Sequence, residues 1–522
     1  MTSLRVFLLG VFLLTSPVAL YAASRTSSKT AAIARQVFEE FAPTGLGVAL
    51  VQNGELVFSG GYGFRRLGQP AKIDTDTLFP IASLTKGFTA AALAVLVDEG
   101  QLDWDDRVID HFPEFRMADP WVTREFTIRD LLTHRSGLPE GAGDLLFWPD
   151  GKATRAEVVQ ALRYLEPTSS FRTEYAYDNL LYIVAGEVVG AVAGTAWEDF
   201  VESRLLAPLG MNDCSALASR VSRDANRATQ HGRVGGFGDP TPLPDDPDEP
   251  TSAAGSIVCS VSSMTRWMRF FLDKGLTAEG ERLISEQQMA ELLTPVTLMR
   301  TGGYIRERGR THFSAYALGW EVSDFHGYFL AEHSGAGIGT TAYIALVPEL
   351  DAAVIALSND FTYATGMFVM QTIDSLIRDE PHDWIGETVR ITARMKELAA
   401  ENSEEALSGV SGTGELELET YAAVYQDPWY GNVVVEFEAD TLKIDMTRSK
   451  ALTGELIRLN GERFLAKWAD RTLNADAYVV FELSADGSVS GMKMSAVSPY
   501  TDFSFDFHDL DLVRLESVRE PE

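Results

Sequence analysis

The sequence predicts an α/β domain built on one antiparallel sheet with helices packed against it, followed by a small all-β domain. Apolar runs at residues 47–51 and 55–59 are joined by Asn53-Gly54, the dipeptide typical of a tight hairpin. Short apolar runs return after a long helical region, so we expect strands from both ends of this domain to share one sheet. Beyond a Ser/Gly/Glu-rich stretch at 402–414, alternating strand patterns fill residues 421–515.

The first 23 residues have the pattern of a secretory signal peptide. Arg5 precedes an apolar run at residues 6–14, and small residues lead up to Ala22-Ala23-Ser24. The apolar run is too short to cross a bilayer, and no cysteine follows the expected cleavage site. The sequence therefore predicts export, to the periplasm or the exterior, with no membrane anchor after cleavage.

These patterns predict four segments: a signal peptide at 1–23, an α/β domain at 24–400, a linker at 401–414 and an all-β domain at 415–522. Within the α/β domain, the spacing of apolar residues predicts further elements in chain order. They are helices at 25–41, from Ser83 onward, at 180–189 and at 262–272, strands at 328–331, 342–347 and 352–357, and a polar helix at 383–401. The proline-rich stretch at 239–250 is expected to be a surface loop without regular structure.

The bulk composition narrows the classes of partner and cofactor. A net charge of −31 argues against nucleic acid and anionic membrane surfaces as partners. His and Cys residues do not cluster with ligand spacing, so we expect neither a metal nor a cofactor. Cys214 and Cys259 are the only cysteines, and a bridge and two buried thiols are equally compatible with the sequence.

The first candidate motif is Ser83-x-x-Lys86 at a predicted helix start. Pro80 disfavours helix before it, so the helix should begin near Ser83, with Lys86 one turn along the same face. A hydroxyl beside an amine at a helix N-terminus is the nucleophile and base pair of acyl-serine catalysts. The spacing alone is weak, because Ser490 and Lys493 repeat it in a predicted strand.

Two further motifs supply the other groups that hydrolysis needs. Tyr177 precedes Asn179 by two residues: a tyrosine whose pKa is lowered by a nearby lysine can shuttle protons, and the asparagine can orient lysine and substrate. His333 and Gly335 follow a predicted strand. A cationic or hydrogen-bonding His333 can hold a substrate carboxylate or carbonyl, and Gly335 lets backbone approach the acyl group.

The backbone can supply an oxyanion hole as well. The N–H of Ala336 is expected to pair with the N–H of Ser83 around the oxygen of a tetrahedral intermediate.

These motifs, in this order, resemble those of the penicillin-recognising serine hydrolases, which include class C β-lactamases, D-alanyl-D-alanine carboxypeptidases, D-aminopeptidases and related esterases. The likeness spans about residues 31–376. It extends to Phe79-Pro80-Ile81-Ala82-Ser83, the segment 131–139, Leu209-Gly210-Met211 and Ala254-Gly255-Ser256. The all-β domain resembles the lipocalin-like tail of certain peptidases of this family, and residues 502–507 are part of that likeness.

The resemblance implies an exported serine hydrolase in which Ser83 attacks a carbonyl, Lys86 and Tyr177 manage the protons, and water releases the acyl group. We predict a peptidase acting on short peptides, including those with D-residues or derived from cyclic or cell-wall peptides. The third motif is His-Ser-Gly rather than the Lys-Thr-Gly usual in these β-lactamases, which argues against β-lactam hydrolysis.

Three alternative functions and the oligomeric state stay open. A carboxylesterase and a β-lactamase would use the same site, whereas a peptide- or peptidoglycan-binding protein would have kept the fold without the chemistry. No Gly-x-Ser-x-Gly elbow is present, so an α/β-hydrolase esterase is excluded. The sequence leaves the oligomeric state open, including assembly through the C-terminal domain.

Overall fold

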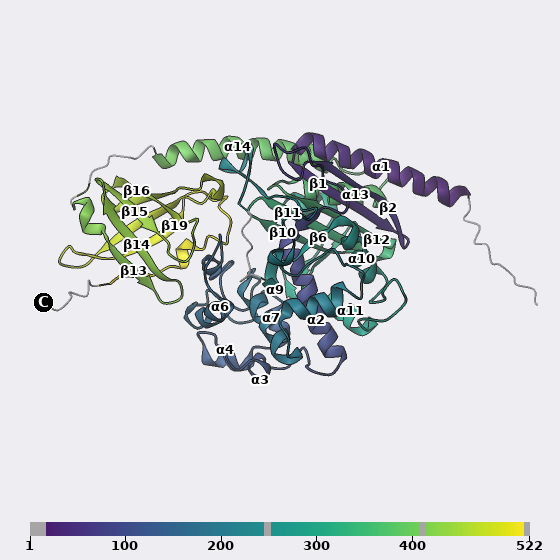
Figure 1. The fold of residues 1–522 in the computed structure, drawn as a ribbon, viewed down its shortest axis with the longest axis horizontal. Helices are drawn as coiled ribbons and strands as arrows, with labels where there is room; N and C mark the ends of the chain where they lie inside the picture. The colour runs from purple at the N-terminus through teal and green to yellow at the C-terminus, as the bar shows by residue number, and fades with distance from the viewer. Residues whose placement is uncertain (1–16, 245–251, 408–413, 415, 516–522) are drawn as a thin grey trace, which may run out of the picture.

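The computed structural model describes residues 17–244, 252–407, 414 and 416–515. Residues 1–16 of the predicted signal peptide, part of the proline-rich stretch and part of the linker lie outside these ranges. Figure 1 shows a larger domain and a smaller barrel side by side, with helix α14 (Trp384–Leu407) running along one edge of the molecule towards the barrel.

One antiparallel sheet organises the larger domain and draws on both of its ends, as predicted. Its order is β2-β1-β12-β11-β10-β9-β8-β7, so the N-terminal strand β1 pairs with the last strand, β12. At the first hairpin, Asn53 and Gly54 have φ of 53° and 70°, as a two-residue turn of this type requires. The strands are β1 (Gly45–Gln52), β2 (Glu55–Gly63), β7 (Thr297–Leu298), β8 (Ser314–Tyr316), β9 (Glu321–Phe325), β10 (Tyr328–Gly337), β11 (Thr340–Val347) and β12 (Ala352–Ser358).

Helices cover both faces of this sheet because its strands alternate between two buried faces. From β1, Leu46, Val48 and Leu50 pack with α1 (Pro17–Phe41), α13 (Ala364–Ile377) and the start of α14. Ala49 and Val51 point the other way, into the main core. That face carries α10 (Val261–Leu272) and the helical region that holds the candidate site.

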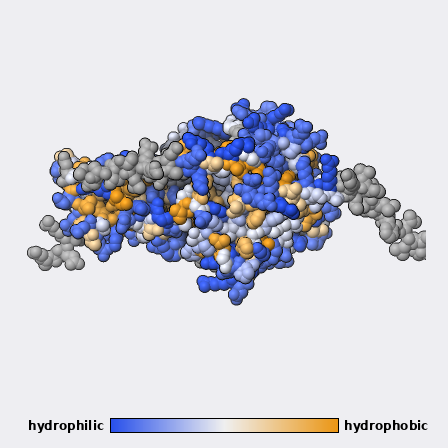
Figure 2. Space-filling model, turned by 90° about the horizontal axis from the view of Figure 1, so that it is seen from above, coloured by the Kyte–Doolittle hydropathy of each residue, from blue (hydrophilic) through white to orange (hydrophobic). Residues whose placement is uncertain are grey.

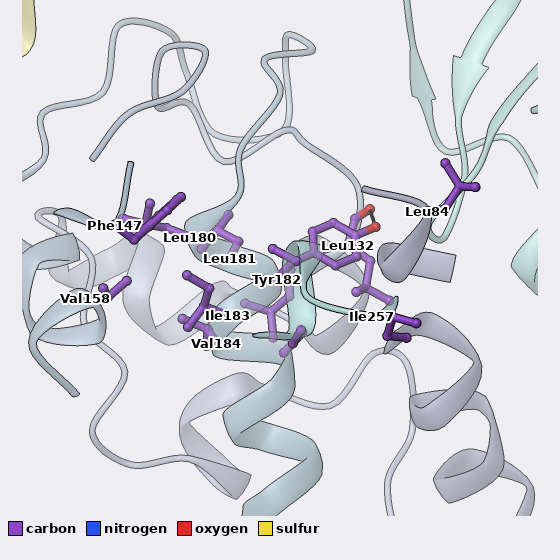
Figure 3. Packing of buried hydrophobic residues seen from close by; sticks show 14 of the residues in the cluster. Leu84, Leu132, Phe147, Val158, Leu180, Leu181, Tyr182, Ile183, Val184 and Ile257 are labelled. Carbon is purple, nitrogen blue, oxygen red and sulfur yellow. Dashed lines mark hydrogen bonds between the residues drawn. The ribbon is translucent and has the colours of Figure 1, made fainter. Parts of the chain in front are cut away.

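The helical region is assembled around α2 (Thr85–Asp98) and α7 (Leu180–Ala193). Every residue of α7 from Leu180 to Ala185 is buried, and Figure 3 shows Leu180–Val184 beside Phe147 and Leu132 in that core. Apart from α10, the other α-helices described between β2 and β8 are short: α3 (Val108–His111), α4 (Pro120–Glu125), α5 (Ile128–Leu131), α6 (Arg155–Ala161), α8 (Trp197–Val201), α9 (Ser252–Gly255), α11 (Glu286–Leu292) and α12 (Gly303–Gly309).

The C-terminal domain is a closed antiparallel barrel of the eight strands β13–β20, in sequence order. Its strands alternate buried and exposed residues, as a filled barrel requires, and the buried set includes Tyr421, Phe464, Trp468 and Phe481. The strands are β13 (Ala423–Asp427), β14 (Gly431–Glu438), β15 (Thr441–Asp445), β16 (Thr453–Asn460), β17 (Arg463–Trp468), β18 (Ala477–Leu483), β19 (Val489–Ala496) and β20 (Leu512–Arg514).

The barrel packs closely against the helical region. The Asp506 carboxylate accepts hydrogen bonds from the Gly143 N–H at 2.6 Å and the Leu145 N–H at 3.1 Å. The buried Ser449 hydroxyl donates to the carbonyl of Pro149. One buried apolar cluster runs through both domains, and on the face in Figure 2 hydrophilic residues predominate over both of them.

Several boundaries differ from those predicted. Helix α1 begins at Pro17 rather than residue 25, α14 continues past Asn402, and β10 continues to Gly337. The expectation that the proline-rich stretch has no regular structure is wrong at β5 (Pro240–Pro242), which pairs with β4 (His231–Arg233). Proline is tolerated there because this two-stranded ribbon leaves an edge that needs no N–H.

A helix that crosses a membrane must be both long and apolar. Among the described residues, no single helix meets both requirements, although Leu180–Ala193 and Trp197–Leu206 do so together across a 74° bend.

Candidate active site

Ser83 lies in the first helical turn after a short two-stranded ribbon. Strand β3 (Leu78–Pro80) pairs with β6 (Val258–Ser260), and the Ile81 N–H donates to the Ile257 carbonyl at 2.9 Å. The turn η1 (Ala82–Leu84) then runs directly into α2, so the predicted helix start is confirmed. Ala82 is held at φ 46°, a left-handed conformation that is costly for alanine and is typical of constrained functional turns.

Lys86 is fully buried beside Ser83 and has three oxygen neighbours. Its Nζ lies 3.1 Å from Ser83 Oγ, 2.7 Å from Asn179 Oδ1 and 3.0 Å from the carbonyl oxygen of Ala254. Burial lowers the pKa of Lys86 to about 7, and the nearby carboxylates of Asp144 and Asp178 act in the opposite direction. In the neutral amine, two N–H groups can serve Asn179 and Ala254, which leaves the lone pair for the Ser83 hydroxyl proton.

Tyr177 closes the other side of the nucleophile. Its phenol hydrogen-bonds Ser83, and Lys86 Nζ lies 4.8 Å from its ring centroid. The expectation of a lowered pKa is wrong: burial raises the pKa of Tyr177 well above its usual value and outweighs the opposing effect of its hydrogen bond with Ser83. Tyr177 is therefore a neutral phenol, able to pass a proton but not to act as a phenolate base.

Asn179 is fixed by contacts on both ends of its amide. Its Oδ1 accepts from Lys86, and its Nδ2 donates to Asp144 Oδ2 at 2.8 Å. Because a carboxylate can only accept, Asp144 sets which end of the amide faces the lysine. Asp144 is itself fully buried, and burial raises its pKa well above the usual value.

The third motif lies within β10, beside the nucleophile, and its glycine is required by geometry. A Cβ on Gly335 would lie 2.5 Å from the Ile81 carbonyl oxygen and 3.2 Å from the Ser83 nitrogen. Only glycine lets β10 come this close, which puts the backbone of Gly335 and Ala336 next to the Ser83 N–H. The predicted oxyanion pair, Ser83 N–H and Ala336 N–H, thus comes from two adjoining segments.

Of the two alternatives for His333, a cationic or a hydrogen-bonding side chain, the cationic one is wrong. Burial lowers the pKa of His333 to about 3, with the Lys86 charge as a second cause. Both ring nitrogens already have protein partners: Nε2 is 2.8 Å from the Tyr316 hydroxyl, and Nδ1 is 2.5 Å from the Ser334 carbonyl oxygen. His333 therefore supports the site as a neutral ring, with no charge to offer a substrate carboxylate.

Sequence reasoning missed four residues of this site. His134 Nδ1 accepts from the Asp178 N–H at 3.0 Å, and its ring lies 4.3 Å from that of Tyr177. Asp144 and Asp178 are buried carboxyls facing Lys86. Phe503, from the barrel, lies edge-on to Tyr177 with ring centroids 5.7 Å apart. His134 and Phe503 lie in the segments 131–139 and 502–507 of the family likeness, and Asp178 lies between Tyr177 and Asn179, so only Asp144 carried no signal.

The motif copies in the barrel do not form a second site. Ser490 donates to the Glu482 carbonyl and Lys493 pairs with Asp511, both on exposed strand positions. Tyr430, which repeats the Tyr-x-Asn spacing with Asn432, donates its hydroxyl to the Met446 carbonyl inside the barrel. Two surface hollows of about 430 and 490 Å³ are lined by none of the predicted site residues.

The comparisons with known proteins agree with this geometry. A family model described as Beta-lactamase matches residues 34–374, nearly two thirds of the sequence. The chain belongs to the β-lactamase family. A second model, a domain of unknown function (DUF3471), matches residues 408–514, which include the barrel strands.

Individual relatives span different parts of this β-lactamase-family chain. It is 26% identical to an unguisins hydrolase of Aspergillus campestris, over 88% of each chain. It is 29% identical to penicillin-binding protein 4 of Amycolatopsis lactamdurans, over 58% of this chain and 77% of that one. Its fold resembles an octameric penicillin-binding protein homologue from Pyrococcus abyssi, with a TM-score of 0.60, 20% identity and coverage of 93% and 99%.

Proposed function

We propose that this β-lactamase-family hydrolase works through an acyl-enzyme on Ser83 and cleaves amide bonds in short peptides. The observation that carries the proposal is the Lys86 amine: two of its neighbours are acceptors, and the third is the Ser83 hydroxyl at 3.1 Å. With a pKa of about 7, this amine can be neutral near neutral pH and can accept the hydroxyl proton as Ser83 attacks.

The steps follow from the same geometry. Ser83 Oγ bonds to the substrate carbonyl carbon while its proton passes to Lys86 Nζ, and the N–H groups of Ser83 and Ala336 hold the oxyanion. The proton then reaches the leaving nitrogen, with the neutral Tyr177 phenol as the bridge, and the C–N bond breaks. Water, deprotonated by the same amine, releases the acyl group and restores Ser83.

The charge pattern favours one class of substrate. His333 is neutral, so the position expected to bind a carboxylate carries no cation. Glu140 lies next to Gly141, whose N–H donates to the Tyr177 carbonyl, and the pKa of Glu140 is raised by burial and by the Asp502 carboxylate. Two neighbouring carboxyls suit a positively charged amino end, so we propose peptides entering amino end first. Substrates with a carboxylate beside the scissile bond, such as β-lactams, are disfavoured.

Three chromogenic substrates test the reaction class. We expect measurable turnover of a D- or L-alanyl anilide, weaker turnover of a short-chain nitrophenyl ester, and none of a cephalosporin. A preference for the ester would favour the carboxylesterase instead. Cephalosporin turnover that exceeds the other two would favour a β-lactamase.

Mass spectrometry after fluorophosphonate treatment separates an enzyme from a binding protein. We expect one adduct on Ser83 and none in Ser83→Ala, in which turnover should also be abolished. A wild-type chain that folds, binds peptides and forms no adduct would instead be the non-catalytic binding protein.

We also propose that the protein is exported. Its leader pattern supports this, as does the Cys214–Cys259 disulfide, because such bonds persist in oxidising compartments. Fractionation of cells that produce the full chain tests the proposal: we expect the protein outside the cytoplasm, shortened after Ala23. An unshortened cytoplasmic protein would contradict it.

A further inference from the structure

A loop of the barrel reaches the groups around Lys86. Phe503 packs on Tyr177, and its carbonyl oxygen lies 2.7 Å from where a Cβ on Gly141 would stand. Three residues further on, Asp506 holds the N–H groups on both sides of Asp144, those of Gly143 and Leu145. The barrel therefore fixes the backbone that carries Asp144.

Ser504 lies between Phe503 and Asp506 and begins a series of hydrogen bonds that ends at Lys86. The Ser504 hydroxyl donates to Asp144 Oδ2 at 2.8 Å, and the same oxygen accepts from Asn179 Nδ2 at 2.8 Å. Asn179 Oδ1 accepts in turn from Lys86 Nζ at 2.7 Å. Ser504 and Asp144 are both buried, so water does not compete freely for these bonds.

The ionisable groups around these hydrogen bonds determine how the Ser504 hydroxyl affects the pKa of Lys86. Burial raises the pKa of Asp144 and the Asp178 charge adds to the rise, whereas the Ser504 and Asn179 hydrogen bonds and the Lys86 charge oppose it. Burial and the Asp144 charge in turn raise the pKa of Asp506. Asp144 and Asp178 raise the pKa of Lys86, while His134 and His333 face it as rings whose own pKa is lowered. The Ser504 hydroxyl thus favours the Asp144 carboxylate, which favours protonated Lys86.

We propose that Ser504, supplied by the C-terminal barrel, is a positioning residue for the Ser83 reaction and acts through Asp144 and Asn179 to orient the Lys86 amine. This rests on the proposed acyl-serine function and goes beyond it, since it gives the barrel a part in the chemistry. It also predicts that the site is incomplete unless the barrel is docked.

The test compares Ser504→Ala with Ser449→Ala in the full-length protein. Both variants remove one buried hydroxyl that the barrel donates across the domain boundary, but Ser449 binds the Pro149 carbonyl and has no link to Lys86. The readout is the rate of fluorophosphonate labelling of Ser83 as a function of pH, which needs no knowledge of the substrate.

We expect Ser504→Ala to lower the labelling rate by about 10- to 100-fold and to move the acid limb of its pH profile to lower pH. The shift follows because Asp144 loses a donor, becomes harder to ionise and stabilises the Lys86 cation less. Ser504→Thr, which keeps the hydroxyl, should have the wild-type labelling rate and the wild-type position of the acid limb. Ser449→Ala should leave the position of the limb unchanged.

The outcomes separate this inference from the function on which it rests. If wild type does not label at Ser83, the proposed function fails. If wild type labels and Ser504→Ala has the wild-type rate and limb, only the positioning role is overturned. If Ser504→Ala does not fold, Asp144→Asn replaces it: a lower rate with the limb shifted downward supports the role, and an unshifted limb overturns it.

Discussion

At the residue scale, the site depends on how enclosure changes proton affinities. At its ordinary pKa, Lys86 would be a cation near neutral pH and could not accept the Ser83 proton. Burial brings the pKa of Lys86 to about 7, keeps Tyr177 neutral and removes the charge from His333. Of the three, only Lys86 changes charge near pH 7. Burial also raises the pKa of Asp178 to about 7, but only the Lys86 amine contacts the Ser83 hydroxyl, so Lys86 sets the pH response.

Activity should therefore rise with pH through about 7. Only the neutral Lys86 amine can accept the Ser83 proton, so the pKa of about 7 predicts a rate that is low below that pH and levels off above it. The measurement is the fluorophosphonate labelling rate between about pH 5 and pH 9. Lys86→Arg, which stays protonated throughout, should lose at least about 10²-fold of the plateau rate and show no rise with pH. A flat wild-type profile would contradict the assignment of Lys86 as base.

Gly335 gives a second prediction at this scale. In Gly335→Ala the new Cβ would lie 2.5 Å from the Ile81 carbonyl oxygen, so β10 must move away from Ser83 and one oxyanion donor with it. Loss of such a donor costs about 10²- to 10³-fold in kcat, measured on the best anilide or ester. Gly337→Ala is the matched control in the same strand, because its Cβ would meet only the Thr340 side chain, at 3.1 Å. Equal losses in both variants would mean general disruption of the strand.

At the element scale, the nucleophile turn is held by a short ribbon tied through a disulfide. Cys259 lies in β6 opposite Phe79 of β3, and it is bonded to Cys214 across a separation of 45 residues. The ribbon alone has few hydrogen bonds, so the covalent link limits how far β6 can move from the turn that carries Ser83.

We expect removal of this disulfide to destabilise the protein by about 2–4 kcal/mol, since a closed loop restricts the unfolded chain. The measurement is chemical denaturation of Cys214→Ala/Cys259→Ala against wild type under non-reducing conditions. Treatment of wild type with a reductant should lower its midpoint by a similar amount and leave that of the double variant unchanged. A reductant effect on the double variant would point to a cause other than the disulfide.

The elements also show which features of the structure could be predicted from the sequence. The hairpin at Asn53-Gly54 and the helix start at Ser83 rest on local chemistry, and both were predictable. The meeting of Ser83, Lys86, Tyr177 and Asn179 was inferred from motif order. The contact between Asp144 and Ser504 could not be found this way, because the two residues are 360 positions apart and the 502–507 likeness does not indicate the partner of Ser504. The pKa of Tyr177 was mispredicted because it depends on enclosure, which only packing reveals.

At the scale of the whole molecule, the two domains share one buried apolar cluster. Phe505 and Phe507 of the barrel loop stack on each other, and Phe505 also meets Trp148 of the helical region edge-on. Asp506, between them, supplies acceptors for two backbone N–H groups of the other domain. Shared burial of this kind couples the unfolding of one domain to that of the other.

Calorimetry of wild type should therefore show a single unfolding transition. In Asp506→Ala the Gly143 and Leu145 N–H groups lose their acceptor, at a cost of about 1–3 kcal/mol each, and the barrel should unfold first in a separate transition. Asp486→Ala, on an exposed barrel turn, removes a carboxylate remote from the other domain and should keep the single transition. Two transitions in wild type would show that the domains are uncoupled.

The pairing of β1 with β12 has a consequence for biosynthesis. The segment carrying Ser83 is translated before β12, so β1 has no partner on its inner edge until β12 leaves the ribosome, and Ser504 follows β12 in the sequence. A growing polypeptide therefore carries its nucleophile for most of translation without the surroundings that activate it. Hydrolysis is therefore expected to begin only after the segment that carries Ser504 has been made and has folded against the helical region.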